Sequence, residues 1–392
     1  MDELVTERMY LNIGPSHPAM HGCFRVKVEL DGETIRRAVC EIGYLHRCFE
    51  KETESHAWNQ VIPYTDRLNY VSPLMNNVGF CMAVEKLMGL EIPERARWIR
   101  MLVCEVSRIC DHLLCIGTNL VDMGALSNFW YLFNAREFFT DWIEALCGAR
   151  LTTSYTRIGG VARDVPEDTD LRLTQCLKKL RVAIKDVKNI IQHNRIFLDR
   201  TCGIGAISQE DAIECGFTGP CLRATGCGYD VRRAHPYYHY EELEWDMPIG
   251  LNGDTYDRIF VRFEEMEQSA HLIEQILKKM PRGPIITDRK DVALSPLHEV
   301  YGSIEGMIDH FKLITESVRV PEGEVYSYTE AANGELGFYI VSDGTDKPYR
   351  IKVRPPCFPI YQAFPRLITN HMVADAIAIM GSLNIIAGEL DR

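Results

Sequence analysis

A helical period from Leu68 to about Leu198 constrains the fold of this chain more than any other feature. One stripe of apolar residues within it recurs every three or four positions: Trp98, Met101, Leu102, Val106, Ile109, Leu113 and Leu114. Residues 128–148 and 167–198 repeat the pattern, the first with many aromatic side chains. Helices of this length bury their stripes against one another, so the sequence predicts a central helical bundle.

Both ends of the chain change to the apolar–polar alternation of β-strands. Residues 9–13, 23–30 and 35–44 predict a small antiparallel sheet, with Asp31–Gly32 as a turn. Residues 323–355 alternate again, with Asp343–Gly344 as a hairpin turn. We expect one set of charges on the solvent face of that hairpin: Glu330, Glu335, Asp343, Arg350, Lys352 and Arg354.

These patterns predict an α+β fold with a small N-terminal antiparallel sheet, a central helical bundle and a β-containing C-terminal region. Residues 200–250 read as irregular structure. Further helices are expected at three places: residues 256–280, 296–317 and 368–380. A chain of 392 residues suggests two or three packing units. The expected units are an N-terminal β domain that carries the first loop, a bundle, and an α+β region that packs back on the bundle, over residues 1–66, 67–200 and 201–392.

The charge balance and hydropathy exclude some classes of protein. The formal net charge is −12, from 43 basic and 55 acidic residues, which argues against a nucleic-acid partner. The most apolar stretch, residues 372–390, is interrupted by Asp375, Asn384 and Glu389, so no membrane-spanning helix is predicted. The N-terminus MDELVTERMY lacks the apolar core of a secretory signal. We expect a cytosolic protein, or one that reaches a membrane through partners.

Fourteen cysteines form no Cys-x-x-Cys pair. The nearest neighbours, Cys110 with Cys115 and Cys221 with Cys227, lack the usual zinc or cluster spacing. The sequence therefore predicts reduced thiols that act mostly as small buried apolar groups, and no metal ligands.

The loop Gly14–Gly22, GPSHPAMHG, holds two histidines between glycines and prolines that block regular structure. Pro18 makes a helical metal pair of His17 and His21 improbable. One interpretation is a turn whose histidines bond to backbone carbonyls. The other is an imidazole presented into a cavity, where it supplies or relays protons near neutral pH.

Other ionisable residues also allow a structural and a functional interpretation. Asp122 follows the apolar stripe, where it either caps a helix at the surface or pairs with an imidazolium. Tyr70 is either a core tyrosine or a hydroxyl that donates to a carbonyl oxygen. His46 and Arg47, with Glu50 nearby, suit a solvated turn or an interface beside a charged cofactor.

Ten motifs resemble, in order, the quinone-binding D subunits of NADH:quinone oxidoreductase, respiratory complex I: LNIGPSHPAMHG, EIGYLHRCFEK, TDRLNYVS, EVSRICDHLL, VDMGALSNFWYLF, YTRIGGVARDVPED, GPCLRATGCGYDVRRAHPY, GELGFYIVSDG, PYRIKVRPP and GELDR. The resemblance covers about residues 9–392. It implies a fold like that of the nickel–iron hydrogenase large subunit. It also implies a core subunit of a proton-pumping complex, peripheral on the cytoplasmic face of the inner membrane.

The resemblance also implies roles for individual residues. His21 and Tyr70 match the two groups that bond the quinone carbonyls, and Asp122 matches the acidic partner of that histidine. Thr118 and Ile386 match positions that line the quinone cavity. Electrons would come from an iron–sulfur cluster of a neighbouring subunit. The other implied partners are the C subunit of the complex and a membrane-arm subunit at the quinone entrance.

Residues near the partner's cluster show one departure from the family. Arg47 matches an arginine beside the iron–sulfur cluster of the neighbouring subunit. His46 directly precedes Arg47 in the sequence. Many members carry a histidine where Thr152 stands, three residues before Tyr155. Without that imidazole we expect a cluster potential that is low and depends weakly on pH, which suits a low-potential quinone such as menaquinone.

Two alternatives stay open at this point. The large subunit of a membrane-bound hydrogenase would need two cysteine pairs, and these positions align with Asn69, Ser72, Ile386 and Glu389. None is a cysteine, which disfavours a nickel–iron centre because thiolates are its natural ligands. A purely structural scaffold descended from either class is the second alternative.

Overall fold

The computed structural model describes residues 8–392, so residues 1–7 of the acidic N-terminus lie outside the described part. Three strands form an antiparallel sheet in the order β1-β2-β3, namely β1 (Arg8–Ile13), β2 (Arg25–Asp31) and β3 (Thr34–Glu41). The predicted N-terminal sheet is therefore confirmed. Alternate residues of β2 (Val26, Val28 and Leu30) are buried against the rest of the molecule.

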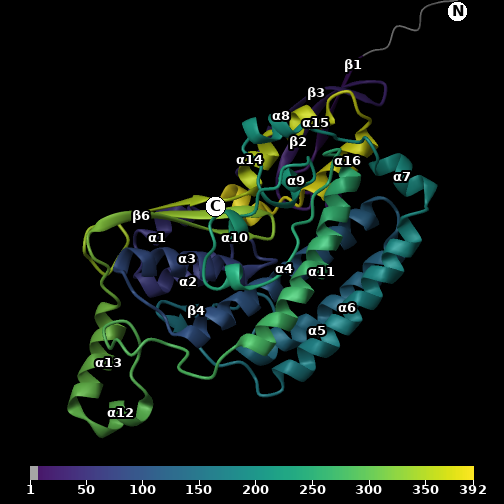
Figure 1. The fold of residues 1–392 in the computed structure, drawn as a ribbon. Helices are drawn as coiled ribbons and strands as arrows, with labels where there is room; N and C mark the ends of the chain where they lie inside the picture. The colour runs from purple at the N-terminus through teal and green to yellow at the C-terminus, as the bar shows by residue number, and fades with distance from the viewer. Residues whose placement is uncertain (1–7) are drawn as a thin grey trace, which may run out of the picture.

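Long helices form the centre of the molecule, as predicted (Figure 1). They are α3 (Pro73–Met88), α4 (Glu94–Asp122), α5 (Leu126–Cys147), α6 (Thr169–Ile191) and α11 (Thr255–Lys279). The longest, α4, packs against α3, α5, α11 and the C-terminal helix α16 (Val373–Leu383). Because α4 has partners on several sides, its buried residues include charged ones as well as the apolar stripe.

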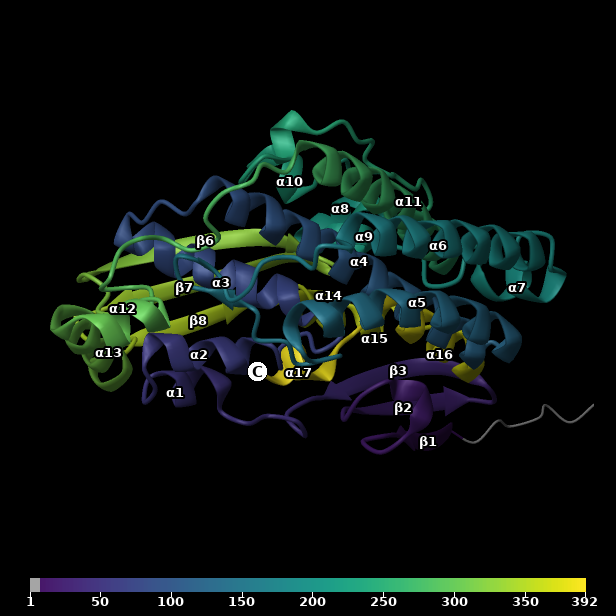
Figure 2. The same ribbon diagram turned by 90° about the horizontal axis from the view of Figure 1, so that it is seen from below.

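A second antiparallel sheet consists of β6 (Gly323–Ala331), β7 (Gly334–Ser342) and β8 (Arg350–Arg354). Helix α3 packs against β6 and β7 (Figure 2). The tight hairpin turn is Ala332–Asn333, between β6 and β7. Asp343–Gly344 lie in a second hairpin connection, as predicted, but this connection is longer and spans residues 343–349 between β7 and β8.

The expected solvent face of this hairpin needs one correction. Asp343, Arg350 and Lys352 are exposed as predicted, whereas Glu335 and Arg354 are half-buried. Glu330 is wholly buried and accepts a hydrogen bond from Arg223 at 2.8 Å. Its face of the sheet is covered by other elements, which the alternation of one strand cannot reveal.

Two predicted helices have different limits. Residues 296–317 form α12 (Leu297–Gly302) and α13 (Ile304–Glu316), which project from the body (Figure 1). Ser303 breaks the helix because its backbone is extended, and its hydroxyl accepts the Gly306 N–H. The last predicted helix, 368–380, begins only at Val373, because the residues before it pair with Ile35 of β3.

Short helices connect these elements: α1 (Phe49–Thr53), α2 (Trp58–Thr65), α7 (Arg195–Thr201), α8 (Gln209–Glu214), α9 (Gly219–Arg223), α10 (Val231–Ala234), α14 (Cys357–Gln362), α15 (Phe364–Ile368), α17 (Ala387–Asp391) and the 3-10 turns η1 (Pro18–Met20) and η2 (Tyr240–Glu242). The pair β4 (Thr156–Arg157) and β5 (Gly160–Val161) forms a minimal hairpin. Several of these lie within residues 200–250, which were expected to be irregular. Among residues 8–392, no helix combines the length and apolarity needed to cross a membrane.

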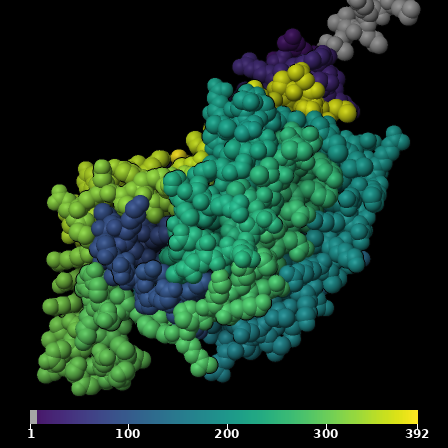
Figure 3. Space-filling view, viewed as in Figure 1, coloured from purple at the N-terminus to yellow at the C-terminus, as the bar shows by residue number. Residues whose placement is uncertain are grey.

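The two ends of the described chain share one hydrophobic core. Helix α15 packs on β3, and α16 packs on the turn η1. Figure 3 shows the purple N-terminal segment and the yellow C-terminal segments side by side at one end of the molecule. This packing brings the first loop to the end of α4.

Candidate active site

The first loop folds into a tight turn that presents His21. His17 caps η1, because its Nδ1 accepts the Ala19 N–H at 3.2 Å. His21 ends the turn with φ +55°, and its own N–H donates to the Pro18 carbonyl. Gly14 is needed before the turn, since a Cβ there would lie 2.2 Å from the Phe24 carbonyl oxygen. His17 therefore shapes the loop, and His21 is free to point elsewhere.

The imidazole of His21 meets the carboxylate of Asp122. The Nε2–Oδ2 distance is 2.5 Å, and the side chains are 22% and 15% exposed. Asp122 is the last residue of α4, where the helix dipole disfavours a negative charge. The contact with the His21 ring offsets that penalty.

Tyr70 approaches the same space from the segment between α2 and α3. Burial raises the pKa of its hydroxyl, and the neighbouring groups Cys357, Cys23, Asp111 and Glu389 add to the rise. Tyr70 is therefore a phenol at neutral pH and can donate a hydrogen bond.

A cavity of about 460 Å³ connects these side chains. Its walls are mainly apolar, and the polar groups gather at His21, Tyr70 and Asp122. The lining residues are Pro18, His21, Tyr70, Val71, Leu114, Cys115, Thr118, Val121, Asp122, Leu126, Phe129, Asn384, Ile385 and Ile386. The space suits a flat organic molecule with two polar oxygens, and the polar groups can give it protons.

The predicted positions Thr118 and Ile386 also lie in this wall. Sequence reasoning missed Asn384 and Phe129, for which no local signal existed. The hydroxyl of Thr118 donates to the Leu114 carbonyl at 2.9 Å, so it is already satisfied within α4.

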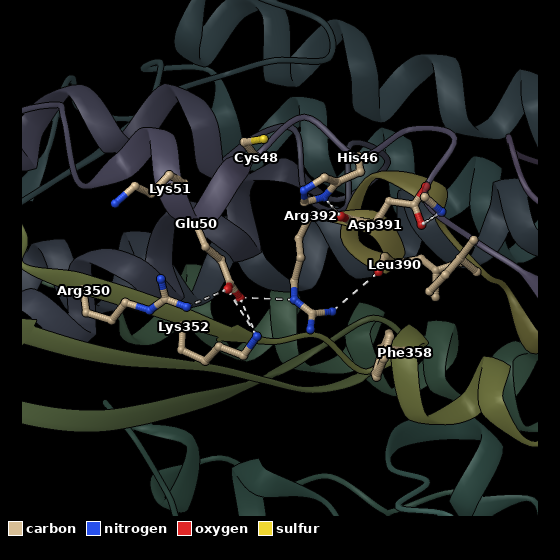
Figure 4. A pocket seen from close by; sticks show the side chains of 12 residues that line it. His46, Cys48, Glu50, Lys51, Arg350, Lys352, Phe358, Leu390, Asp391 and Arg392 are labelled. Atoms are coloured by element: carbon tan, nitrogen blue, oxygen red, sulfur yellow. Dashed lines mark hydrogen bonds and ion pairs between the residues drawn. The ribbon is translucent and has the colours of Figure 1, made fainter.

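His46 lies in a second cavity, of about 420 Å³, formed by the loop after β3, the β8 strand and the C-terminal residues (Figure 4). Its Nδ1 lies 2.6 Å from the Asp391 carbonyl oxygen, and Asp391 accepts backbone N–H groups from Gly43 and Leu45. Glu50 forms ion pairs with Arg350, Lys352 and Arg392 at 3.1–3.6 Å. Exposed basic groups thus line this cavity, as Figure 4 shows.

Arg47 and Thr152 lie outside both cavities. The Arg47 guanidinium donates to the Arg67 carbonyl, and burial lowers its pKa, with the Arg67 charge adding to the effect. Thr152 precedes Ser154, which donates from its N–H to the carboxylate of Asp66. Arg47 is thus bonded to residue 67, and the segment that follows Thr152 is bonded to Asp66.

The positions that align with hydrogenase cysteines carry neutral or acidic side chains. Asn69 and Ser72 both donate to Asp111, at 3.0 and 2.8 Å. In the part of the chain that the structure describes, no group of His, Cys, Asp and Glu residues has a metal-binding arrangement. All fourteen cysteines are free, seven of them buried, among them Cys81, Cys110 and Cys357.

The fold and the cavity thus define a mixed α+β protein with a mainly apolar cavity that is lined by an imidazole, a carboxylate and a phenol. Residues 122–392 match the family model described as respiratory-chain NADH dehydrogenase, 49 kDa subunit. The chain is 52% identical to the first D-type subunit of NADH-quinone oxidoreductase from Sorangium cellulosum, over all of this chain and 97% of that one. It is 50% identical to the D-type subunit from Myxococcus xanthus, over 99% of this chain and 94% of that one. It is also 54% identical to the C/D-type subunit from Bdellovibrio bacteriovorus, of which it spans 70%. The chain therefore belongs to the family of the 49 kDa, or D-type, subunit of NADH-quinone oxidoreductase.

Proposed function

We propose that this chain is the core subunit that forms, with a cluster-bearing neighbour, the site where complex I reduces quinone to quinol. One observation carries the proposal: the His21–Asp122 pair and the Tyr70 hydroxyl lie in one mainly apolar cavity of about 460 Å³. Apolar walls suit a quinone ring, and two donors suit its two carbonyl oxygens.

Quinone reduction consumes two electrons and two protons. His21, protonated beside Asp122, gives one proton to a quinone oxygen, and Tyr70 gives the other or polarises its carbonyl. Quinol formation leaves a neutral imidazole and a tyrosinate, and both must be reprotonated. In the assembled enzyme, we propose, this change of charge helps to drive proton pumping.

Electrons reach the site from an iron–sulfur cluster of the neighbouring subunit. We propose that His46, Arg47 and Thr152 lie toward that cluster. The anchoring of Arg47 to residue 67, three positions from Tyr70, supports this arrangement. The basic cavity of Figure 4 then faces the neighbouring subunit.

The other proposed partners are the C subunit of the complex and a membrane-arm subunit at the quinone entrance. The Bdellovibrio relative is named as a C/D-type subunit, which supports a close association with the C subunit. Contact with the membrane is through these partners, on the cytoplasmic face of the inner membrane.

The test measures quinone reduction by the assembled complex with His21→Ala or Tyr70→Phe. Loss of a proton donor is expected to reduce turnover by about a hundredfold, while the complex keeps all of its subunits. Thr315→Ala, on the projecting helix α13, is the control and keeps full turnover. Normal turnover in either site variant would remove that residue from the proposed site.

A further inference from the structure

Two buried carboxyl groups lie behind the cavity wall, Asp111 on α4 and Glu389 on α17. Both residues are 0% exposed. Within residues 8–392, neither forms an ion pair with a basic side chain, and every hydrogen bond that the structure gives them comes from a neutral donor. Two such carboxylates cannot both stay ionised at low cost, because burial and mutual repulsion both favour the neutral acid.

The hydrogen bonds determine which of the two keeps the charge. Asp111 accepts three: from Asn69 at 3.0 Å, from Ser72 at 2.8 Å and from Asn384 at 2.7 Å. Three donors stabilise a carboxylate. Glu389 accepts the Cys357 backbone N–H at 3.2 Å, and its Oε2 is buried without any partner among the described residues. With fewer donors to stabilise its charge than Asp111 has, Glu389 is the member that we expect to hold the proton.

The location of Glu389 connects it with the proposed site. A Cβ on the preceding residue, Gly388, would lie 2.5 Å from the Leu68 carbonyl oxygen and 3.2 Å from Cδ1 of Tyr70. The backbone of α17 is therefore packed directly on the Tyr70 segment. Asn384, which lines the cavity, bonds to both Asp111 and Asn333, and Asn333 also interacts with Glu389.

We propose that Glu389 is a positioning residue that holds a proton behind the cavity wall and, by its charge state, controls how readily Tyr70 gives up its own proton. The proposal rests on the quinone-site function above. When Glu389 is neutral, a tyrosinate at position 70 has one negatively charged neighbour fewer, so Tyr70 releases its proton more readily. When Glu389 ionises, the added charge holds the proton on Tyr70 and slows quinol formation.

The electrostatics agree with this geometry. Burial raises the pKa of Glu389 to about 7, and the charge of Asp111 adds to the rise. The titratable groups that face Glu389 are Cys357 on α14, Asp111 on α4 and Tyr70. Burial raises the pKa of the Cys357 thiol far above neutrality, so it stays uncharged. The group that changes its charge near neutral pH is therefore Glu389 and not Cys357.

The experiment compares the pH profile of quinone reduction in the assembled complex with and without Glu389→Gln. Glutamine mimics the neutral acid and cannot ionise. Turnover by the unaltered complex should fall as pH rises through about 7, and the variant should lose this fall. The ratio of turnover at alkaline pH to turnover at acidic pH should be about threefold higher in the variant than in the unaltered complex. A factor of about three corresponds to half a pKa unit. An unchanged pH profile in the variant overturns the proposal.

Two further measurements separate this inference from the proposed function. Glu335→Gln, on the neighbouring strand β7, is the matched control and should keep the pH-dependent fall. Infrared difference spectra across neutral pH should show the carbonyl band of a protonated carboxylic acid, absent in Glu389→Gln. A band that persists in the variant overturns the assignment of the proton. If His21→Ala and Tyr70→Phe both keep normal turnover, the proposed function fails. If they do not, and Glu389→Gln changes nothing, this inference alone fails.

Discussion

Two groups of buried charges in this molecule are arranged in opposite ways. In the helical core, four carboxylates and three guanidinium groups form an arginine–carboxylate cluster: Glu105, Arg108, Arg223, Asp230, Arg232, Glu265 and Glu330. Behind the cavity, Asp111 and Glu389 have no cation among residues 8–392. In the first group, arginine charges outweigh burial and lower the pKa of Glu105 and Glu265, although burial and the charge of Asp230 raise that of Glu330. The second group has no arginine in the described part of the chain that could offset burial.

The pKa values show the same contrast. Although burial alone would raise it, the Arg223 charge and the His112 imidazole hold the pKa of Glu265 well below its usual range. The pKa of Glu389, which lacks such a partner in the described chain, rises instead. A paired charge contributes to the structure, and an unpaired carboxyl beside a cavity is available for chemistry.

The largest effect is expected when the arginine–carboxylate cluster loses Arg223. Its guanidinium contacts Glu265 at 2.7 Å, Glu330 at 2.8 Å and Asp230 at 3.2 Å. Arg223→Met leaves Glu330 without its ion pair, whereas Asp230 keeps Arg232 and Glu265 keeps His112. Because a buried carboxylate then lacks its cation, the free energy of unfolding should fall by roughly 3–5 kcal/mol. Denaturant unfolding of the full chain measures this.

Arg150 offers a matched control for that prediction. It also forms ion pairs with three carboxylates, Glu137, Asp141 and Glu144, but at the surface. Arg150→Met should leave stability almost unchanged, because water and salt screen exposed pairs. Equal losses in both variants would contradict the distinction between buried and exposed pairing.

The second effect concerns the stability of the chain against pH. The folded pKa of Glu389 is about 7, above its ordinary value of 4.5, so the folded state binds this proton more tightly. Below pH 4.5 both states are protonated and the residue has no effect. As pH rises toward 7 the folded state loses up to about 3 kcal/mol, and the loss then levels off.

Glu389→Gln should therefore gain stability relative to the unaltered chain between about pH 5 and about pH 8. Unfolding experiments on both chains at these two pH values measure the change. A stability difference that is the same at both values would mean that Glu389 does not titrate in the folded protein.

A smaller effect is expected at the mostly buried pair His21–Asp122. Asp122→Asn removes the carboxylate that holds the His21 ring at 2.5 Å, so quinone reduction should fall about tenfold. Asp186→Asn, an exposed position on α6, is the control. Turnover of Asp122→Asn equal to that of Asp186→Asn would indicate that the Asp122 carboxylate has no part in quinone reduction.

The smallest effect concerns the partner's cluster. With Thr152 in place we expect its potential to vary weakly with pH. Thr152→His should add a slope of up to about 60 mV per pH unit near neutrality. Redox titrations of the terminal cluster at several pH values compare the unaltered enzyme with the Thr152→His variant. A steep slope in the unaltered enzyme would refute the role assigned to Thr152.

Periodicity located most of the long elements correctly. Residues 128–148 match α5, and residues 256–280 match α11, because each helix buries a stripe whose spacing is written in the sequence. The helix predicted over 296–317 breaks at Ser303, since a side-chain cap competes with helix continuation there. The prediction that Glu330 is exposed was wrong, because the alternation along one strand does not show what covers each face of the sheet.

The sequence by itself determined the helical core, the two sheets and a loop able to present an imidazole. It also supplied the family likeness from which His21, Tyr70 and Asp122 were chosen. The tertiary structure decided that these three side chains, 101 residues apart between His21 and Asp122, meet in one cavity. It also decided that Glu389 is buried without a cation from the described chain. Burial and charge pairing depend on which distant segments pack together, and no local pattern contains that information.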